Sequence, residues 1–311
     1  MDNKILSDAL VAMLGTSNVK TDEPMRLHTT FRIGGPADYY VSPQTEKQIT
    51  DVVAFLKKSD ISYIVIGNGS NILVSDNGFR GVVVELGDAF SSFERLQENP
   101  DDPDSVFVRA SAGMRLTRLG NQLAADGITG FEFATGIPGC IGGAVRMNAG
   151  AYGGEFKDIL VNARVIDESG CIRELSVDEL ELGYRTSIIA RSNMIVLEAV
   201  LKLRKGEPDT IRKNISELAI KRRQKQPLEY PSAGSTFKRP EGYFAAKLIE
   251  DAGLKGCMRG GAQVSDKHAG FVVNKADATA ADVCELTDYI KDIVMDKFKV
   301  KLELEVVKVG F

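Results

Sequence analysis

The stretch Phe133–Glu155, FATGIPGCIGGAVRMNAGAYGGE, decides how the whole sequence is interpreted. It carries neither a helical nor a strand period of apolar residues. Glycine lets backbone amides approach a ligand closely and adopt positive φ, which builds concave N–H nests for a phosphate or a flat ring. A loop this long inside a domain is uncommon unless it is functional, so we favour a cofactor cradle over a ligand-free loop. The stretch contains a single cation, Arg146. It also contains seven glycines, which are Gly136, Gly139, Gly142, Gly143, Gly150, Gly153 and Gly154.

Length and composition indicate an ordinary globular protein. The chain has 311 residues, of which 43% are hydrophobic and 26% charged, and this size suits two or three domains. The net charge is −4 and there is no block of Lys or Arg, which argues against a nucleic-acid or membrane-surface partner. Any anionic ligand must therefore be held by backbone donors and a few placed cations.

Cysteine and histidine usage excludes further classes of site. No CxxC pair exists and there are only two histidines, so we expect no metal site and no disulfide framework. The first residues lack the pattern of a secretion signal, and no apolar run reaches about 18 residues. We therefore expect a cytoplasmic protein that does not contact the membrane. The four cysteines are Cys140, Cys171, Cys257 and Cys284.

A second glycine motif follows the predicted strand Tyr63–Ile66. It reads Gly67-Asn68-Gly69-Ser70-Asn71-Ile72, and its GxG resembles a dinucleotide fingerprint. The residues after it, ILVSDNGFRGVVVEL, have strand and turn chemistry rather than helix chemistry, so the Rossmann interpretation fails. A tight loop between strands can still present backbone and side-chain amides to a pyrophosphate. Taken alone, the motif fits an ordinary turn at least as well.

The remaining patterns predict short strands, varied connections and few long helices, which favours an α+β fold. A domain break is expected at Gly206-Glu207-Pro208. The basic run Lys221-Arg222-Arg223 fits either a solvated helix end or a phosphate site. We expect helices at Asn3–Leu14, from Ser42-Pro43 onward, at Leu116–Leu123, at Val177–Leu182, after Pro208, at Tyr243–Ala252, and after a Thr279/Asp282 cap.

The chain closes with a predicted strand, Lys299–Val309. Its apolar residues alternate with charged ones, among them Glu305. Periodicity alone makes Glu305 a solvent-facing strand residue.

Nine separated stretches carry the most distinctive motifs, and they are His28–Asp38, Gly67–Leu73, Gly136–Gly143, Met147–Glu155, Gly183–Ser187, Ala233–Lys238, Gly260–Ser265, Lys267–Phe271 and Leu302–Val306. Together they resemble one family, the UDP-N-acetylenolpyruvoylglucosamine reductases of bacterial cell-wall precursor synthesis. They occur in family order over nearly the whole chain, and the ordered set is specific although each motif is weak. The short segment between Arg185 and Ser235 resembles the form of the family that lacks a substrate-clamping insertion.

The resemblance implies an FAD-binding region of the vanillyl-alcohol-oxidase (PCMH) type in two subdomains, followed by a smaller α+β substrate-binding domain. The boundaries are residues 1–205 for the FAD region (subdomains about 1–87 and 88–205), 206–300 for the substrate domain, and 301–311 for a closing strand that carries Glu305. FAD would bind non-covalently. The implied cofactor-binding residues are Gly67, Asn68, Gly69, Ser70, Asn71, Ile72, Gly136, Gly139, Cys140, Ile141, Gly142, Gly143, Asn148 and Gly150.

The implied reaction reduces UDP-N-acetylglucosamine enolpyruvate to UDP-N-acetylmuramate with NADPH. Flavin N5 delivers hydride to the terminal alkene carbon, and the enolate that develops must be stabilised and protonated. By resemblance, Arg185 pairs with the substrate carboxylate, Glu305 faces it with a raised pKa, and Ser235 protonates the enolate carbon. The partners are the two substrates only, and we expect a monomer. Contacts to the sugar and diphosphate are assigned to Tyr152, Lys238 and Arg239.

Departures and alternatives remain open. Cys140 stands where the family commonly carries Ser or Thr. Arg185 could be a surface cation and Ser235 a turn residue, while His268 is expected to be structural or cofactor-adjacent rather than catalytic. A flavin oxidase or dehydrogenase acting on an alcohol or sugar would not need Ser235 as a proton donor. A non-catalytic flavin-binding protein would need neither Ser235 nor Glu305.

Overall fold

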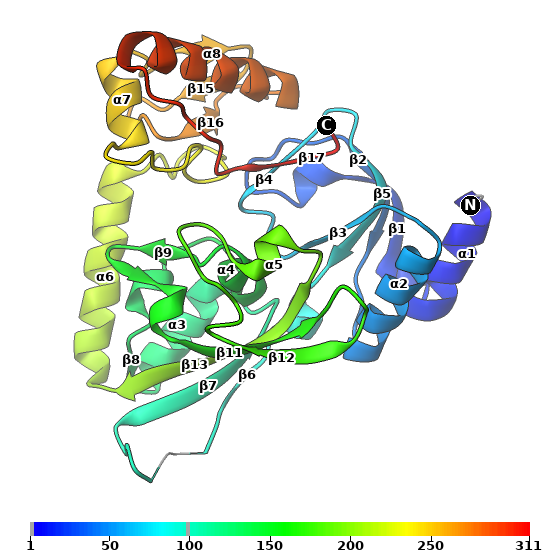
Figure 1. Ribbon diagram of the computed structural model, residues 1–311. Coiled ribbons are helices and arrows are strands. Elements are labelled where there is room, and N and C mark those ends of the chain that lie inside the picture. The colour runs from blue at the N-terminus through cyan, green and yellow to red at the C-terminus, as the bar shows by residue number, and fades with distance from the viewer. Residues whose placement is uncertain (1–2, 98–99) are drawn as a thin grey trace. The chain divides into compact units, whose positions relative to one another are not determined.

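The structure is a computed structural model that describes residues 3–97 and 100–311. The chain forms two compact units, here called unit 1 and unit 2. Unit 1 comprises Met1–Lys20, Tyr40–Asn68 and Val83–Lys221, and unit 2 comprises Thr21–Tyr39, Gly69–Val82 and Arg222–Phe311. Helices and strands mix irregularly in both units, which confirms the α+β prediction (Figure 1).

Most of the secondary structure belongs to unit 1. Its α-helices are α1 (Asn3–Leu14), α2 (Glu46–Lys58), α3 (Leu116–Ala125), α4 (Ile141–Arg146) and α5 (Ile188–Arg191). Its strands are β3 (Tyr63–Ile66), β6 (Phe93–Arg95), β7 (Ser105–Ser111), β8 (Ile128–Thr129), β9 (Gly150–Ala151), β10 (Gly154–Glu155), β11 (Leu160–Ile166), β12 (Ile172–Ser176) and β13 (Ile195–Lys205). Short 3-10 helices lie at Thr16–Asn18, Asp88–Phe90, Glu132–Ala134 and Phe156–Asp158.

Unit 2 is smaller. It contains the 3-10 helix Met25–Leu27, the helices α7 (Ala245–Asp251) and α8 (Ala280–Phe298), and the strands β4 (Ile72–Val74), β14 (Met258–Arg259), β15 (Ala262–Val264), β16 (Val272–Asn274) and β17 (Val307–Val309). Helix α6 (Pro208–Lys225) and the strands β1 (Val19–Pro24), β2 (Pro36–Val41) and β5 (Phe79–Glu85) contribute residues to both units. Strands β1, β2, β5 and β3 form one sheet in that order.

The core of unit 1 is built on a six-stranded sheet of order β12-β11-β13-β7-β6, with β8 also paired to β13. All of these pairings are antiparallel. Strand β13 is central, and nearly all of its residues from Ile195 to Leu201 are buried. Helix α4 packs against β13, while α3 buries Leu116, Leu119 and Leu123, which share one helical face. This packing fixes α4, which comes from the glycine-rich stretch, on the sheet.

The core of unit 2 is formed by α7, α8 and the sheet β14-β15-β16. Helix α8 buries Val283, Leu286, Ile290 and Val294, which recur at the spacing of one helical face. Strand β17 pairs in parallel with β4, and Val307 lies opposite Ile72. This pairing holds the end of the chain beside the residues that follow the Gly67–Ile72 loop.

The start predicted for the helix after Ser42-Pro43 is wrong, and so is the helix predicted at Val177–Leu182. Helix α2 begins at Glu46 rather than at Pro43, because the side chain of Thr45 caps it, whereas the Ser42 hydroxyl donates to Glu85. Residues 177–182 form turns rather than a helix. There the Glu179 carboxylate accepts hydrogen bonds from Ser176, which closes a turn that does not propagate.

The closing strand is also shorter than predicted. Helix α8 ends at Lys299, which adopts left-handed φ (58°), and the regular strand covers only Val307–Val309. Between them, Leu304 forms an isolated antiparallel bridge with Phe237. The alternation still holds in part, because Leu302 and Val306 are buried while Glu303 is exposed.

Within 3–97 and 100–311, no helix is long and apolar enough to cross a membrane.

The predicted cap of α8 by Thr279 and Asp282 is confirmed. The Asp282 carboxylate accepts from the Thr279 and Gly261 amides, and these bonds hold its pKa below the usual value. We expect Asp282→Ala to lower the free energy of unfolding by about 0.5–2 kcal/mol at pH 7. Because the folded pKa is depressed, this stabilisation exists above the unfolded value of about 3.9 and is lost as pH falls towards the folded pKa.

Urea unfolding at pH 7 and at successively lower pH measures this difference. The control is Asp292→Ala, on an exposed position in the middle of the same helix. If both variants lose the same stability, or if the Asp282 effect does not shrink in acid, the cap does not act as described.

Candidate functional site

Unit 1 contains a pocket of about 240 Å³ where the two glycine motifs meet. Its volume suits one part of a dinucleotide, since pockets for whole drug-sized ligands measure about 300–1,000 Å³. Three predicted cofactor residues, Gly67, Asn68 and Cys140, line it. The other lining residues are Ser42, Pro43, Gln44, Glu85, Leu86, Gly87, Asp88, Ala89, Gly113 and Arg115.

Direct contacts join the two motifs at this pocket. The Asn68 side-chain amide donates to the Pro138 carbonyl at 2.7 Å. A Cβ on Gly67 would lie 3.2 Å from Cβ of Cys140, which is closer than almost all real Cβ contacts. Glycine at position 67 therefore lets the backbone of one motif approach the other.

Gly113 brings a third segment to the pocket, and sequence reasoning missed it. A Cβ at this position would lie 2.4 Å from the carbonyl oxygens of both Leu86 and Gly87, so only glycine fits. Strand β7 ends at Ser111, and Gly113 follows it after the buried Ala112. A glycine at the end of a buried strand was the signal that could have found it.

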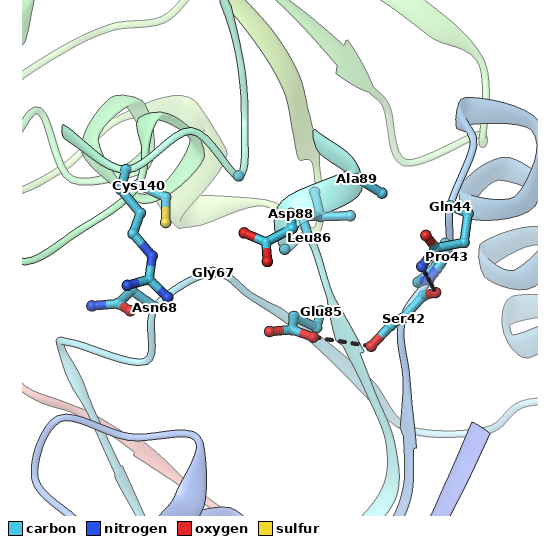
Figure 2. Close-up of a pocket in the computed structure, with 13 residues that line it drawn as sticks. Ser42, Pro43, Gln44, Gly67, Asn68, Glu85, Leu86, Asp88, Ala89 and Cys140 are labelled. Carbon is cyan, nitrogen blue, oxygen red and sulfur yellow. Dashed lines mark hydrogen bonds between the residues drawn. The ribbon is translucent and has the colours of Figure 1, made fainter. Parts of the chain in front are cut away.

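Two carboxylates, those of Glu85 and Asp88, are among the side chains that line the pocket. Figure 2 shows the carboxylates of Glu85 and Asp88 directed towards the side on which Asn68 and Cys140 lie. Glu85 accepts a hydrogen bond from the Ser42 hydroxyl at 2.9 Å. Arg115 is the single cation among the thirteen lining residues. Carboxylates can accept from hydroxyl or amino groups of a nucleotide, and Arg115 can approach a phosphate.

The thiol of Cys140 is kept neutral by its surroundings. Burial raises its pKa, and the nearby carboxylates of Glu85 and Asp88 act in the same direction. A backbone amide of Asn68 and the charge of Arg115 oppose this effect but do not cancel it. Cys140 is therefore a weak hydrogen-bond donor in a position where it faces the pocket.

This environment predicts slow alkylation. Because the thiolate is the reactive form, we expect iodoacetamide at pH 7.5 to modify buried Cys140 many times more slowly than exposed Cys171. Mass spectrometry of peptides after timed quenching measures both rates in one sample. Unfolding in urea should abolish the difference. Equal rates in the folded protein would contradict the neutral, buried thiol.

The glycine-rich stretch is more ordered than its composition suggests. It contains helix α4, in which Ile141, Ala144 and Val145 are buried. The amides of Ile141 and Gly142 donate to the carbonyls of Met114 and Ala112. These two amides are therefore used within the protein. Gly136 and Gly143 are exposed, and a Cβ on Gly143 would meet no atom within 4 Å.

Residues in the second half of the glycine-rich stretch form hydrogen bonds with the turn that carries Arg185. Asn148 is fully buried, and its amide donates to Glu155 at 2.7 Å and to the Gly183 carbonyl at 3.0 Å, while its oxygen accepts from the Lys157 amide. Arg185 donates to the Gly150 carbonyl at 3.2 Å. Asn148 and Gly150 thus position the Gly183–Ser187 turn.

The backbone of this region is strained at three predicted site residues, one of which is Asn148 with φ 41°. Arg185 has φ 54° and Tyr152 has φ 53°, a region that residues other than glycine seldom occupy. Such strain gathers at functional sites. Tyr152 is 48% exposed, and the guanidinium of Arg185 lies 5.1 Å from the ring centroid of Tyr184.

In unit 2, the structure brings Ser235 and Glu305 close along the backbone. The Glu305 amide donates to the carbonyl of Thr236 at 2.9 Å, and the Lys238 amide donates to the carbonyl of Glu303 at 2.8 Å. Phe237 and Leu304 form the bridge between these two bonds. Ser235 is exposed and Glu305 half-buried. Arg185 belongs to unit 1, so its approach to these two residues stays a prediction.

The predicted cofactor residues of unit 2 lie in the loop before strand β4 and at its first residue. The Asn71 side chain donates to the Glu305 carbonyl at 3.2 Å, and Val307 donates to the Asn71 carbonyl. Gly69 is buried and a Cβ there would lie 2.0 Å from the His28 carbonyl. Ser70 is half-buried, and Ile72 opens β4.

The two predicted substrate cations differ in their surroundings. Lys238 lies 3.9 Å from the Glu303 carboxylate. Arg239 stacks at 3.8 Å over the exposed ring of Phe244.

Comparison with known proteins gives the family. Residues 37–176 match the FAD binding domain model, and residues 226–309 match the model for the C-terminal domain of UDP-N-acetylenolpyruvoylglucosamine reductase. The reductase of Clostridioides difficile (strain 630) is 49% identical over 310 residues, covering 100% of this chain and 99% of that protein. The chain belongs to the UDP-N-acetylenolpyruvoylglucosamine reductase family.

Other members agree. The reductase of Clostridium tetani (strain Massachusetts / E88) is 48% identical over 97% of this chain and 95% of its own length. The crystal structure of the reductase from Thermus caldophilus superposes with a TM-score of 0.77 at 32% identity, covering 92% of this chain and 97% of that chain. The predicted fold, an FAD-binding region followed by the C-terminal domain of this reductase family, is confirmed.

Proposed function

We propose that this protein is an FAD-dependent reductase that uses NADPH to convert UDP-N-acetylglucosamine enolpyruvate to UDP-N-acetylmuramate in peptidoglycan precursor synthesis. One observation carries the proposal: the likeness to reductases of this name extends over the full chain. The short backbone ladder that joins Ser235–Lys238 to Glu303–Glu305 supports it further.

The pocket of unit 1 fits part of an FAD molecule. Gly67 and Gly113 let the backbone segments that line the pocket approach one another more closely than any Cβ would allow, and Asn68, Arg115 and the two carboxylates supply polar partners. When bound, the flavin supplies the hydride that the terminal alkene carbon of the substrate receives. Gly67, Asn68, Gly113, Arg115 and Cys140 would hold this part of the cofactor, largely through backbone approach.

Arg185 binds the carboxylate of the enolpyruvyl group. Its planar guanidinium can donate two parallel hydrogen bonds to a carboxylate, which a lysine cannot do. The bond to Gly150 and the Asn148-supported turn hold the arginine in place before substrate arrives. The same pair of bonds grows stronger as negative charge develops on the carboxylate, and this lowers the barrier.

Ser235 donates a proton to the carbon next to the carboxylate, and Glu305 faces the carboxylate from the other side. A hydroxyl is a weak acid, but a carbanion-like carbon is basic enough to take its proton. Glu305 must carry a proton or share a hydrogen bond there, because a bare anion would repel the substrate. Tyr152, Lys238 and Arg239 bind the sugar and the diphosphate. We further propose that the protein acts as a cytoplasmic monomer.

An anaerobic two-step experiment tests this function. NADPH is added until the flavin absorbance is lost, and the enolpyruvyl UDP-sugar follows. We expect the absorbance to return at once, with one UDP-N-acetylmuramate formed per flavin, as measured by mass spectrometry. A UDP-sugar without the enolpyruvyl group is the control and should restore nothing. Failure of the substrate to restore the absorbance would contradict the proposal.

A further inference from the structure

A chain of hydrogen bonds in unit 2 connects His268 with the segment that carries Ser235. The amide of Gly270 donates to Nδ1 of His268 at 3.1 Å, and the Gly270 carbonyl accepts from the Thr236 amide at 2.9 Å. Thr236 directly follows Ser235 and is 2% exposed. Its carbonyl accepts from the Glu305 amide, and its hydroxyl accepts from the Val272 amide at 2.9 Å.

The packing around His268 leaves its ring little freedom. A Cβ on Gly270 would lie 3.0 Å from Cε1 of His268, so the ring and the glycine are in close contact. The ring also packs edge-on against Phe271, with centroids 5.0 Å apart. The backbone amide of His268 donates to the Ser265 hydroxyl at 3.2 Å. The position of Nδ1 is therefore fixed by contacts on several sides.

Nδ1 can accept from Gly270 only when it carries no proton. Burial lowers the pKa of His268, and the charges of Lys255 and Lys225 act in the same direction, while a backbone hydrogen bond within His268 and the charge of Glu250 oppose them without cancelling the effect. At neutral pH the ring is neutral, and the Gly270 bond places its proton on Nε2. Protonation of Nδ1 in acid would turn an acceptor into a donor that faces the Gly270 amide.

We propose that His268 is a positioning residue for proton donation: through Gly270 and Thr236 it holds the backbone of Ser235 and Glu305 in register. This inference rests on the proposed function, because it assigns a task to Ser235. His268 contacts neither the substrate nor the reacting atoms in this role. Its loss should change how fast the substrate is protonated rather than whether the protein folds or is reduced by NADPH.

Two variants separate the role of the acceptor from that of the ring. In His268→Asn, the side-chain oxygen lies the same number of bonds from Cα as Nδ1 and can accept from Gly270. In His268→Leu, a carbon takes that place and the buried Gly270 amide loses its partner. We expect His268→Leu to slow flavin reoxidation by the enolpyruvyl UDP-sugar about tenfold or more, with flavin reduction by NADPH unchanged. His268→Asn should restore most of the rate.

The pH profile gives a second readout. In the wild type, reoxidation should slow only in acid, at a pH lower than the ordinary histidine pKa of about 6.5, because burial lowers the pKa of His268. This acid limb should be absent in His268→Asn, whose amide does not titrate. If His268→Leu folds poorly, this comparison alone decides the question.

The outcomes are distinct. A wild type that the substrate does not reoxidise contradicts the proposed function, whatever the variants do. A normal wild type with an equally fast His268→Leu overturns the positioning role. So does a His268→Asn protein that keeps the acid limb of the wild type.

Discussion

Ser235→Ala should be reduced by NADPH at the wild-type rate and should then be reoxidised by the enolpyruvyl UDP-sugar at least 10²–10³ times more slowly. Removing one donor that acts in the transition state typically costs about 2.7–4 kcal/mol, and loss of the proton donor should cost no less. Alanine keeps the backbone bonds of the neighbouring Thr236, so the fold of the segment should survive. Stopped-flow absorbance of the flavin measures both half-reactions separately.

The control lies three residues earlier. Ser232→Ala removes a hydroxyl from the same loop, one that only weakly accepts from the Gly234 amide at 3.5 Å. It should leave both half-reactions close to wild type. If Ser235→Ala is reoxidised as fast as this control, Ser235 is not the proton donor, even though the family is correct.

Gly113→Ala should destabilise unit 1 and weaken the binding of FAD. The new Cβ would lie 2.4 Å from two backbone carbonyls, those of Leu86 and Gly87, and backbone cannot move aside as a flexible side chain can. Overpacking of this kind typically costs about 1–3 kcal/mol. The segment that must move lines the pocket with Glu85 and Asp88, so the cofactor loses part of its site. Thermal unfolding of the apoprotein and FAD titration by flavin fluorescence measure the two effects.

Gly143→Ala is the matched comparison. This glycine lies within helix α4, and a Cβ there meets no protein atom within 4 Å. Alanine should therefore stabilise the apoprotein, by about 0.5–1 kcal/mol. A loss of FAD affinity in this variant would indicate that the cofactor passes over Gly143. If Gly113→Ala is as stable as Gly143→Ala, the close approach at Gly113 does not exist.

The sequence predicted the elements whose signals are local. The Thr279/Asp282 cap of α8, the α3 stripe of leucines and the strand before Gly67 depend on neighbours within a few residues. Helix α4 was missed because its apolar residues are too few to show a period, and β13 supplies the surface against which they are buried. The helix predicted at Val177–Leu182 is wrong because the hydrogen bonds from Ser176 to Glu179 close a single turn, and such a turn can form without continuing into a helix.

The pocket was only partly predictable for a similar reason. Glu85, Asp88 and Arg115 look like surface charges in their local sequence, and only the fold brings them beside Asn68 and Cys140. Motif residues can also serve the protein itself rather than a ligand. The side chain of Asn148 forms hydrogen bonds with Glu155, Gly183 and Lys157. A sequence motif alone cannot distinguish such an internal role from contact with a cofactor.

The flavin content of the purified protein directly tests whether the glycine-rich stretch binds FAD. Denaturation releases a non-covalent cofactor, and chromatography identifies and quantifies it. We expect one FAD per chain, or apoprotein that takes up one added FAD per chain. A colourless protein that binds no added FAD would contradict the assignment of the glycine-rich stretch and of every step that depends on it.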